Sequence, residues 1–313
     1  MAGQPTARNR IHFQDEMSWK DLDLLPRDES IFFFTLAPVQ GHGPHLPCGF
    51  GAHSAEAFAL ATAKEFCQRR EGWHAIIAPH LPIGSHTYSL PGTLDCHPTI
   101  IRRILEDWGA SLASNGFHYI MVISTHTGPG HIRAIEDACE RVSRKQDIDM
   151  IAPMGPKISA YLAGEYDEKL QRLAGEKQEH SFAQDVLGGR WETSMALYLR
   201  PDLVKPNYER LKPVLIDPEE LGPDSPINAG DGEGYLGSPH LANVELGKAS
   251  VQSVARDFTE LLFQLLRGED VSQRISTPWE GSVYLYEYYN VTIVVLALIA
   301  VGLFWSLLRL LLP

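Results

Sequence analysis

Residues 40–54, QGHGPHLPCGFGAHS, place three histidines among four glycines and two prolines, without any Asp or Glu. Such a density of histidine indicates a metal site or a catalytic base, because imidazole both binds metals and titrates near neutral pH. A hydrolytic metal site normally also uses a carboxylate ligand. The segment is therefore either part of a metal site completed from elsewhere or the remnant of one.

Two further groups complete a candidate ligand set. His126 lies in the second glycine-containing loop, THTGPG, and Glu192 opens the helix-like segment ETSMALYLR. Two histidines and one carboxylate, here His42, His126 and Glu192, can hold one divalent ion with open positions. Such an ion lowers the pKa of a bound water and polarises a carbonyl oxygen. The alternative is that these histidines only hydrogen-bond backbone groups around the glycine turns, since the chain contains 13 histidines.

The elements that would position these residues alternate between strands and helices. Apolar runs predict buried strands at 31–39, 74–79, 118–124 and 150–153, and apolar residues at helical spacing predict helices at 54–69, 99–116, 131–145 and 243–268. This pattern predicts an α/β three-layer sandwich with a mostly parallel central sheet. Ligands of such sheets bind beyond the carboxyl ends of the strands. We therefore expect the loops at 40–54 and 125–131 to meet in one cleft.

The order of five motifs resembles the creatininase family of metal-dependent amidohydrolases. These are GHGPHLPCG, LPGTL, STHTGPG, GGRWETSMALYLRPDLV and GYLGSPHLANVELGKA, which lie in sequence between Ile31 and Leu266. The resemblance implies the family's fold, a largely parallel sheet flanked by helices. It also implies a centre of two metal ions that activates water to open a cyclic or linear amide.

The family's metal ligands are only partly retained. The resemblance assigns retained histidine ligands to His42 and His126 and the glutamate of the Glu-Thr-Ser motif to Glu192. The departures fall at Gln40 for the first glutamate, Gly51 for the bridging aspartate, Gly128 for a carboxylate of some members, and Leu187 for a histidine.

The loss of the bridging aspartate decides how the centre is interpreted. Two dications about 3.5–4 Å apart repel each other and need anionic bridging ligands. Gly51 offers no side-chain oxygen, although His53 lies close enough in sequence to be a substitute. We expect either no metal or one divalent ion, zinc, manganese or iron, at His42, His126 and Glu192.

Three functions follow from this interpretation. The first is a non-catalytic family member that serves as a subunit or scaffold of a membrane complex. The second is a membrane-anchored, metal-dependent amidohydrolase that acts on a small, cyclic amide at a mononuclear or rearranged site. The third is binding or sensing of a ligand in the same cleft.

The C-terminal segment predicts a single transmembrane helix at 291–312. Residues 291–308 carry no charge, and an apolar run of about 18 or more residues can span a bilayer as a helix. Four tyrosines precede the run, as expected at a membrane interface. The proposed anchor residues are Val291, Leu296, Phe304, Trp305 and Arg309. No signal peptide is apparent, so we expect a tail anchor with the globular domain on the cytoplasmic side.

These features divide the chain into an N-terminal extension at 1–30, a creatininase-like domain at 31–268, a juxtamembrane connector at 269–290 and the span. The net charge of −12 argues against nucleic-acid binding. The four cysteines are widely spaced, which is typical of reduced thiols. We expect the partners to be the lipid bilayer and either other subunits of a membrane complex or further copies of the chain.

Overall fold

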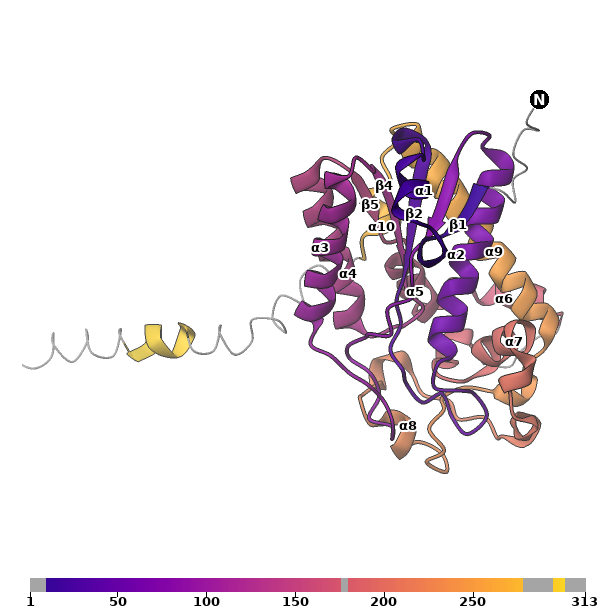
Figure 1. The fold of residues 1–313 in the computed structure, drawn as a ribbon. Helices are drawn as coiled ribbons and strands as arrows, with labels where there is room; N and C mark the ends of the chain where they lie inside the picture. Colours follow the sequence, from indigo (N-terminus) through magenta and orange to yellow (C-terminus); the bar gives the residue numbers. More distant parts are fainter. Residues whose placement is uncertain (1–9, 176–179, 278–294, 302–313) are drawn as a thin grey trace, which may run out of the picture. The chain divides into compact units, whose positions relative to one another are not determined.

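The computed structural model describes residues 10–175, 180–277 and 295–301 (Figure 1). The chain divides into two units, Met1–Thr277 and Pro278–Pro313. The first unit contains the sheet, the helices around it and every candidate ligand named above.

In the described residues the sheet has five strands in the order β1-β3-β2-β4-β5. The strands are β1 (Ile11–Phe13), β2 (Ser30–Thr35), β3 (His74–Ile77), β4 (Tyr119–Ile123) and β5 (Asp149–Ile151). Every pairing between them is parallel. The predicted α/β fold with a parallel central sheet is therefore confirmed.

The central strand β2 is buried along its whole length. Phe32 and Phe34 belong to a hydrophobic core shared with Ile101 and Leu105. Strands that are buried on both faces appear in sequence as continuous apolar runs, which explains why IFFFTL gave so clear a signal.

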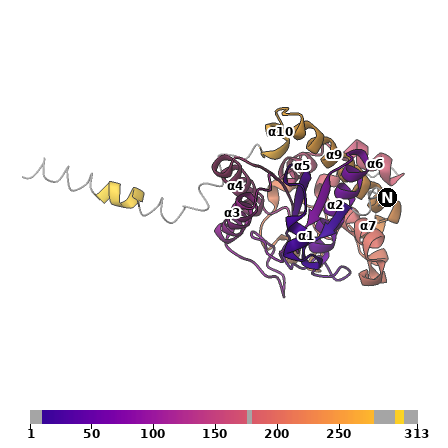
Figure 2. The same ribbon diagram turned by 45° about the horizontal axis from the view of Figure 1, so that its top comes forward.

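Helices cover both faces of the sheet (Figure 2). One layer contains α3 (Pro98–Ser114) and α4 (Pro129–Gln146), and the other contains α2 (Phe50–Arg69), α7 (Arg190–Leu199) and α9 (Val244–Leu266). The shorter helices are α1 (Trp19–Asp23), α5 (Met154–Leu162), α6 (Asp167–Ala174), α8 (Ser225–Asn228) and α10 (Ser272–Ile275).

The boundaries differ from the sequence interpretation in three places. Strand β1 lies within the predicted N-terminal extension 1–30 and pairs with β3, so the sheet begins before residue 31. Helix α2 begins at Phe50 rather than Ser54, so Gly51 lies in its first turn. The first compact unit extends to Thr277, past the expected end at 268, because α10 packs on α5.

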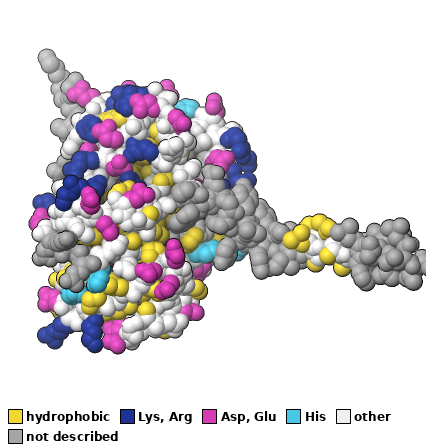
Figure 3. All heavy atoms as spheres, turned by 180° about the vertical axis from the view of Figure 1, so that it is seen from behind, with side chains coloured by type: hydrophobic (Ala, Val, Ile, Leu, Met, Phe, Trp, Pro, Cys, Tyr) yellow, Lys and Arg dark blue, Asp and Glu magenta, His cyan; other side chains and the backbone are white. Residues whose placement is uncertain are grey.

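The predicted span 291–312 falls largely outside the described residues. Residues 295–301 are helical, and their large apolar side chains are exposed. Among the residues that the structure describes, no helix is both long and apolar enough to cross a membrane. On the face shown in Figure 3, acidic and basic side chains are mixed, and hydrophobic side chains are visible between them.

Candidate functional site

The two histidine-bearing loops meet at the carboxyl edge of the sheet. Strands β2 and β4 are neighbours, with Thr35 paired to Ile123, and each leads directly into one loop. A cavity of about 20 Å³ lies between the loops. Its wall includes Gln40, His42, Gly51, His126, Leu187 and Glu192. The expected common cleft is thus confirmed, although its volume suffices only for about one water molecule or ion.

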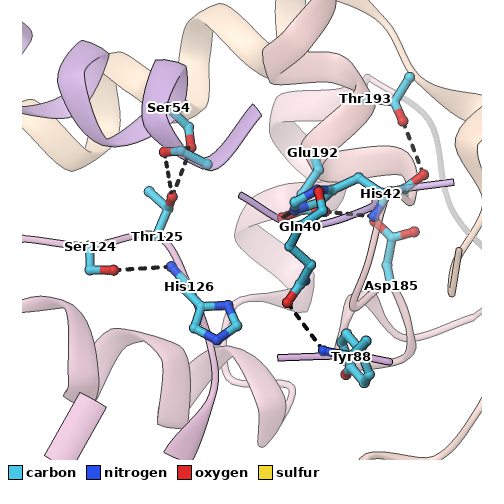
Figure 4. A network of polar contacts seen from close by, with 12 residues as sticks. Gln40, His42, Ser54, Tyr88, Ser124, Thr125, His126, Asp185, Glu192 and Thr193 are labelled. Carbon is cyan, nitrogen blue, oxygen red and sulfur yellow. Dashed lines mark hydrogen bonds and ion pairs between the residues drawn. The ribbon is translucent and has the colours of Figure 1, made fainter. Parts of the chain in front are cut away.

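His42 and Glu192 face each other across this cavity (Figure 4). The Nδ1 atom of His42 lies 2.8 Å from the Gln40 carbonyl oxygen, which assigns its proton to Nδ1. The Nε2 atom then presents a lone pair toward the Glu192 Oε1 atom at 3.9 Å. Two acceptors facing each other at this distance need a proton, a water molecule or a cation between them. A backbone carbonyl behind the imidazole is also typical of histidine that binds metal.

Glu192 is held by the turn at the start of α7. Its Oε2 atom accepts the Gly188 N–H at 2.6 Å, and only 13% of its side-chain surface is exposed. Burial raises the pKa of the Glu192 carboxyl, and the nearby His42 opposes that shift. The hydrogen bond from the Gly188 backbone therefore orients the Glu192 carboxyl group toward His42.

Asp185 fixes this turn, and the sequence interpretation did not include it. Its Oδ1 atom accepts the backbone N–H groups of Arg190 and Ser238, at 2.6 and 2.9 Å, and its Oδ2 atom accepts that of Trp191 at 2.7 Å. Burial raises the pKa of the Asp185 carboxyl despite these three donors. The available signal was an acid shortly before a helix, which is typical of a residue that binds the helix's free N–H groups.

His126 points into the same region but is already engaged. Its Nε2 atom lies 2.9 Å from the Ser85 carbonyl oxygen, to which only a protonated nitrogen can donate. Burial lowers the pKa of His126 to about 4, so the ring is neutral at pH 7. In this arrangement Nε2 donates a hydrogen bond, and the lone pair of the neutral ring lies on Nδ1.

Neighbouring atoms close the space beside Gly51 and Gly128, two positions that the resemblance assigns to ligands. A Cβ atom on Gly51 would lie 2.9 Å from the Ala37 Cβ atom. The Gly51 carbonyl accepts the hydroxyls of Ser54 and Thr125, at 3.0 and 3.1 Å. A Cβ atom on Gly128 would lie 2.6 Å from both His126 Nε2 and the Ser85 carbonyl oxygen. Neither position accepts a longer side chain without displacing its surroundings.

The other two departures also have structural roles. Leu187 is 2% exposed and packs in a hydrophobic cluster with Val186, Tyr235 and Leu236. The Gln40 side-chain oxygen accepts the Tyr88 N–H at 3.2 Å. These residues stabilise the loops by packing and neutral hydrogen bonding.

The remaining loop histidines do not complete a ligand set. The Nε2 atom of His53 faces the Arg200 guanidinium at 3.4 Å, so His53 is directed at a cation and does not replace an acid at Gly51. His45 Nε2 lies 2.9 Å from the Thr193 hydroxyl, and burial lowers the pKa of His45 to about 4.

The described residues do not fit a dinuclear metal centre. No group of three or more His, Cys, Asp or Glu side chains in the described part of the chain is arranged to hold a metal ion. His42, His126 and Glu192 line one cavity, in which His42 and Glu192 direct acceptor atoms at each other while Nε2 of His126 donates to the Ser85 carbonyl. Binding of one ion by all three residues stays a prediction.

Solved structures share this fold over most of the chain. A manganese creatininase aligns with a TM-score of 0.64 and 20% identity, covering 81% of this chain and 98% of its own. A creatinine amidohydrolase (creatininase) gives 0.64 and 21%, covering 81% and 97%. A mutant creatininase of Zn–Zn type gives 0.62 and 19%, covering 81% and 97%. At these identities the likeness establishes the fold alone.

No curated protein sequence matches this chain. The family model described as creatinine amidohydrolase matches residues 15–262, which is most of the chain. The chain therefore belongs to the creatininase family.

Proposed function

We propose that this chain is a non-catalytic member of the creatininase family that serves as a membrane-anchored subunit or scaffold. The closed position at Gly128 carries the proposal, because its Cβ site is bounded by two carbonyl oxygens and the His126 ring. The charge-free segment at 291–308 supports the anchor. The proposed partners are the bilayer and either other subunits or further copies of the chain, with the globular unit on the cytoplasmic side.

The experiment for the first part is elemental analysis of the full chain, purified without chelator. Related creatininases are named for manganese and Zn–Zn forms, so manganese, zinc and iron are all measured. We expect each metal well below one equivalent per chain. Two tightly held equivalents would show that the loops rearrange into a dinuclear centre and would overturn the proposal.

A second candidate is an amidohydrolase with one metal ion, and one observation favours it. The His42 Nε2 and Glu192 Oε1 atoms face each other across a cavity of about 20 Å³, with the Nδ1 proton of His42 fixed on a backbone carbonyl. Bound there, an ion would supply an activated water. About one equivalent of metal that is lost in Glu192→Gln and kept in Glu56→Gln selects this candidate.

The anchor is tested by detergent phase partitioning of the full chain and of a chain that ends at Thr277. We expect the full chain in the detergent phase and the shortened chain in the aqueous phase, because only the former carries the apolar run. A full chain that remains in the aqueous phase would contradict the anchor and leave the metal analysis unaffected.

A further inference from the structure

A second cavity lies beside the closed centre and has a different character. It measures about 100 Å³ and is lined by residues of α5, α6, α7 and α9. Thr125, Thr127, Val186 and Glu192 line both cavities, so the larger one extends outward from the centre. An apolar cavity of roughly 150 Å³ admits benzene, so this somewhat smaller cavity suits at most a small ring compound.

Tyr161 and Trp191 form an aromatic part of the cavity wall, and the polar atoms of both side chains have hydrogen-bond partners. The Trp191 indole N–H donates to the Ser250 hydroxyl at 3.0 Å, and the Tyr161 hydroxyl donates to the Asp185 carbonyl at 2.9 Å. The Tyr161 and Trp191 rings lie 5.5 Å apart with an interplanar angle of 35°. What these two residues offer a ligand is therefore aromatic surface, which favours another aromatic ring.

The inner end offers a hydrogen-bond acceptor. One Glu192 oxygen accepts the Gly188 N–H, whereas Oε1 is 3.9 Å from His42 Nε2, beyond hydrogen-bond distance. A ligand that enters from the larger cavity approaches this carboxyl group. An N–H or O–H group at the leading edge of the ligand would satisfy it.

Charged side chains of both signs lie around the outer part of the cavity. Lys157 forms an ion pair with Asp257, and Arg274 donates to the same Asp257 carboxyl group at 3.0 Å. Lys169 contributes a further positive charge to the lining. A ligand with a carboxylate would be repelled by the buried Glu192, and a ligand with an ammonium group would be repelled by Lys169, since Lys157 is paired with Asp257. This arrangement favours an uncharged ligand.

From these observations we infer that the α5–α9 cavity binds an uncharged aromatic ring compound that carries an N–H or O–H donor, with the ring against the paired Tyr161 and Trp191 side chains and the donor toward Glu192. The inference requires no metal ion and goes beyond the proposed scaffold function. Recognition rests on aromatic surface and one directed hydrogen bond.

The test is a binding titration of the full chain with phenol and indole, using calorimetry or saturation-transfer NMR. Toluene lacks the donor, while benzoate and benzylamine add a charge, so these three compounds test each part of the inference. We expect saturable binding of phenol and indole with a Kd on the order of a millimolar or below. Each comparison compound should bind at least about fivefold more weakly than phenol.

Substitutions on α9 test whether phenol binds in this cavity. Ser253 lines the cavity, whereas its neighbour Gln252 is exposed. We expect Ser253→Phe to weaken phenol binding at least about tenfold and the matched control Gln252→Phe to leave it unchanged. Val254→Phe, also in the lining, is the second blocking variant if Ser253→Phe fails to fold.

Three results would overturn the inference. These are equal binding by wild type and a folded blocking variant, tighter binding of benzoate or benzylamine than of phenol, and no saturable binding of phenol or indole by wild type. None of them depends on the metal content, so failure here is distinguishable from failure of the proposed function.

Discussion

The two cavities share a wall but differ in how the chain fills them. At the carboxyl edge of the sheet, Ala37 lies against Gly51, the Ser85 carbonyl lies against Gly128 and Leu187 packs in a hydrophobic cluster, leaving a cavity of about 20 Å³. Beside it, the α5–α9 cavity retains about 100 Å³. The chain therefore leaves a smaller cavity at the polar centre than in the space next to it.

A fold and the chemistry of its site can separate, because the site depends on a few single side chains. The strand order, the two loops and Glu192 remain in place, yet the atoms around Gly51 and Gly128 leave no room for acids. A site that had only lost its acids would keep empty space at those positions.

The strongest test of closure is Gly128→Ala. The added methyl group would lie 2.6 Å from the Ser85 carbonyl oxygen and from His126 Nε2, so the loop must move and the hydrogen bond between them must break. We expect the free energy of unfolding to fall by about 3 kcal/mol or more, measured by urea denaturation.

The matched control is Gly49→Ala. A Cβ atom there has no neighbour within 4 Å, and its φ of −86° is ordinary for any residue. We expect less than about 1 kcal/mol of change. If the two alanines cost the same, the centre is not closed at Gly128 and the contrast between the cavities fails.

A second prediction concerns how well water is excluded from Glu136, which shares a cavity with His126. Glu136 and His126 line one cavity of about 10 Å³. Burial raises the pKa of Glu136 to about 7, partly opposed by hydrogen bonds from Thr277, at 3.1 Å from its N–H and 2.9 Å from its hydroxyl. Arg133 lowers this pKa and Asp137 raises it.

Because the folded pKa lies above the unfolded one, the stability contributed by Glu136 is fully present below pH about 4.5 and is lost as the pH rises through about 7. Glu136→Gln lacks this titration. We expect the variant to gain about 2–3 kcal/mol on wild type between pH 4 and pH 8, measured by urea denaturation at each pH. A pH-independent difference would mean that water reaches Glu136.

The sequence was sufficient for the framework of the centre because the relevant signals are local. Apolar runs marked the strands, and parallel strands bring their carboxyl ends together, so the meeting of the Gln40 and His126 loops followed. The start of α2 was predicted four residues late, since Gly49 and Gly51 give neither a side-chain cap nor helix propensity.

The remaining features depend on contacts between distant segments. The bond from His126 to the Ser85 carbonyl spans 41 residues, and no pattern around either residue announces it. Residues of the α5–α9 cavity run from Thr125 to Asp257 and appear in sequence as ordinary helical residues. The short strand β1 was missed because three residues, Ile11–Phe13, are too few for a periodicity.

A third prediction asks whether the centre reopens when an acid is restored. Gly51→Asp places Cβ against the Ala37 Cβ at 2.9 Å, so we expect a loss of about 1–2 kcal/mol and no gain in bound metal. Ala37→Gly removes the obstructing methyl group. In a double-mutant cycle the pair should be less destabilised than the sum of the single variants by about 1 kcal/mol. Additive effects, or tight metal binding by Gly51→Asp alone, would contradict closure at this position.

The smallest expected effect concerns the open cavity. Trp191→Phe keeps an aromatic wall and removes the hydrogen bond to the Ser250 hydroxyl, so we expect a loss of about 1 kcal/mol in unfolding free energy. Phenol affinity should change by less than about threefold, because the wall acts through its aromatic face. Trp191→Ala removes that face and should weaken phenol binding by about tenfold. If the phenylalanine variant weakens phenol binding as much as the alanine variant does, recognition depends on the indole N–H of Trp191. The aromatic face would then not be what distinguishes this cavity from the hydrogen-bonded centre beside it.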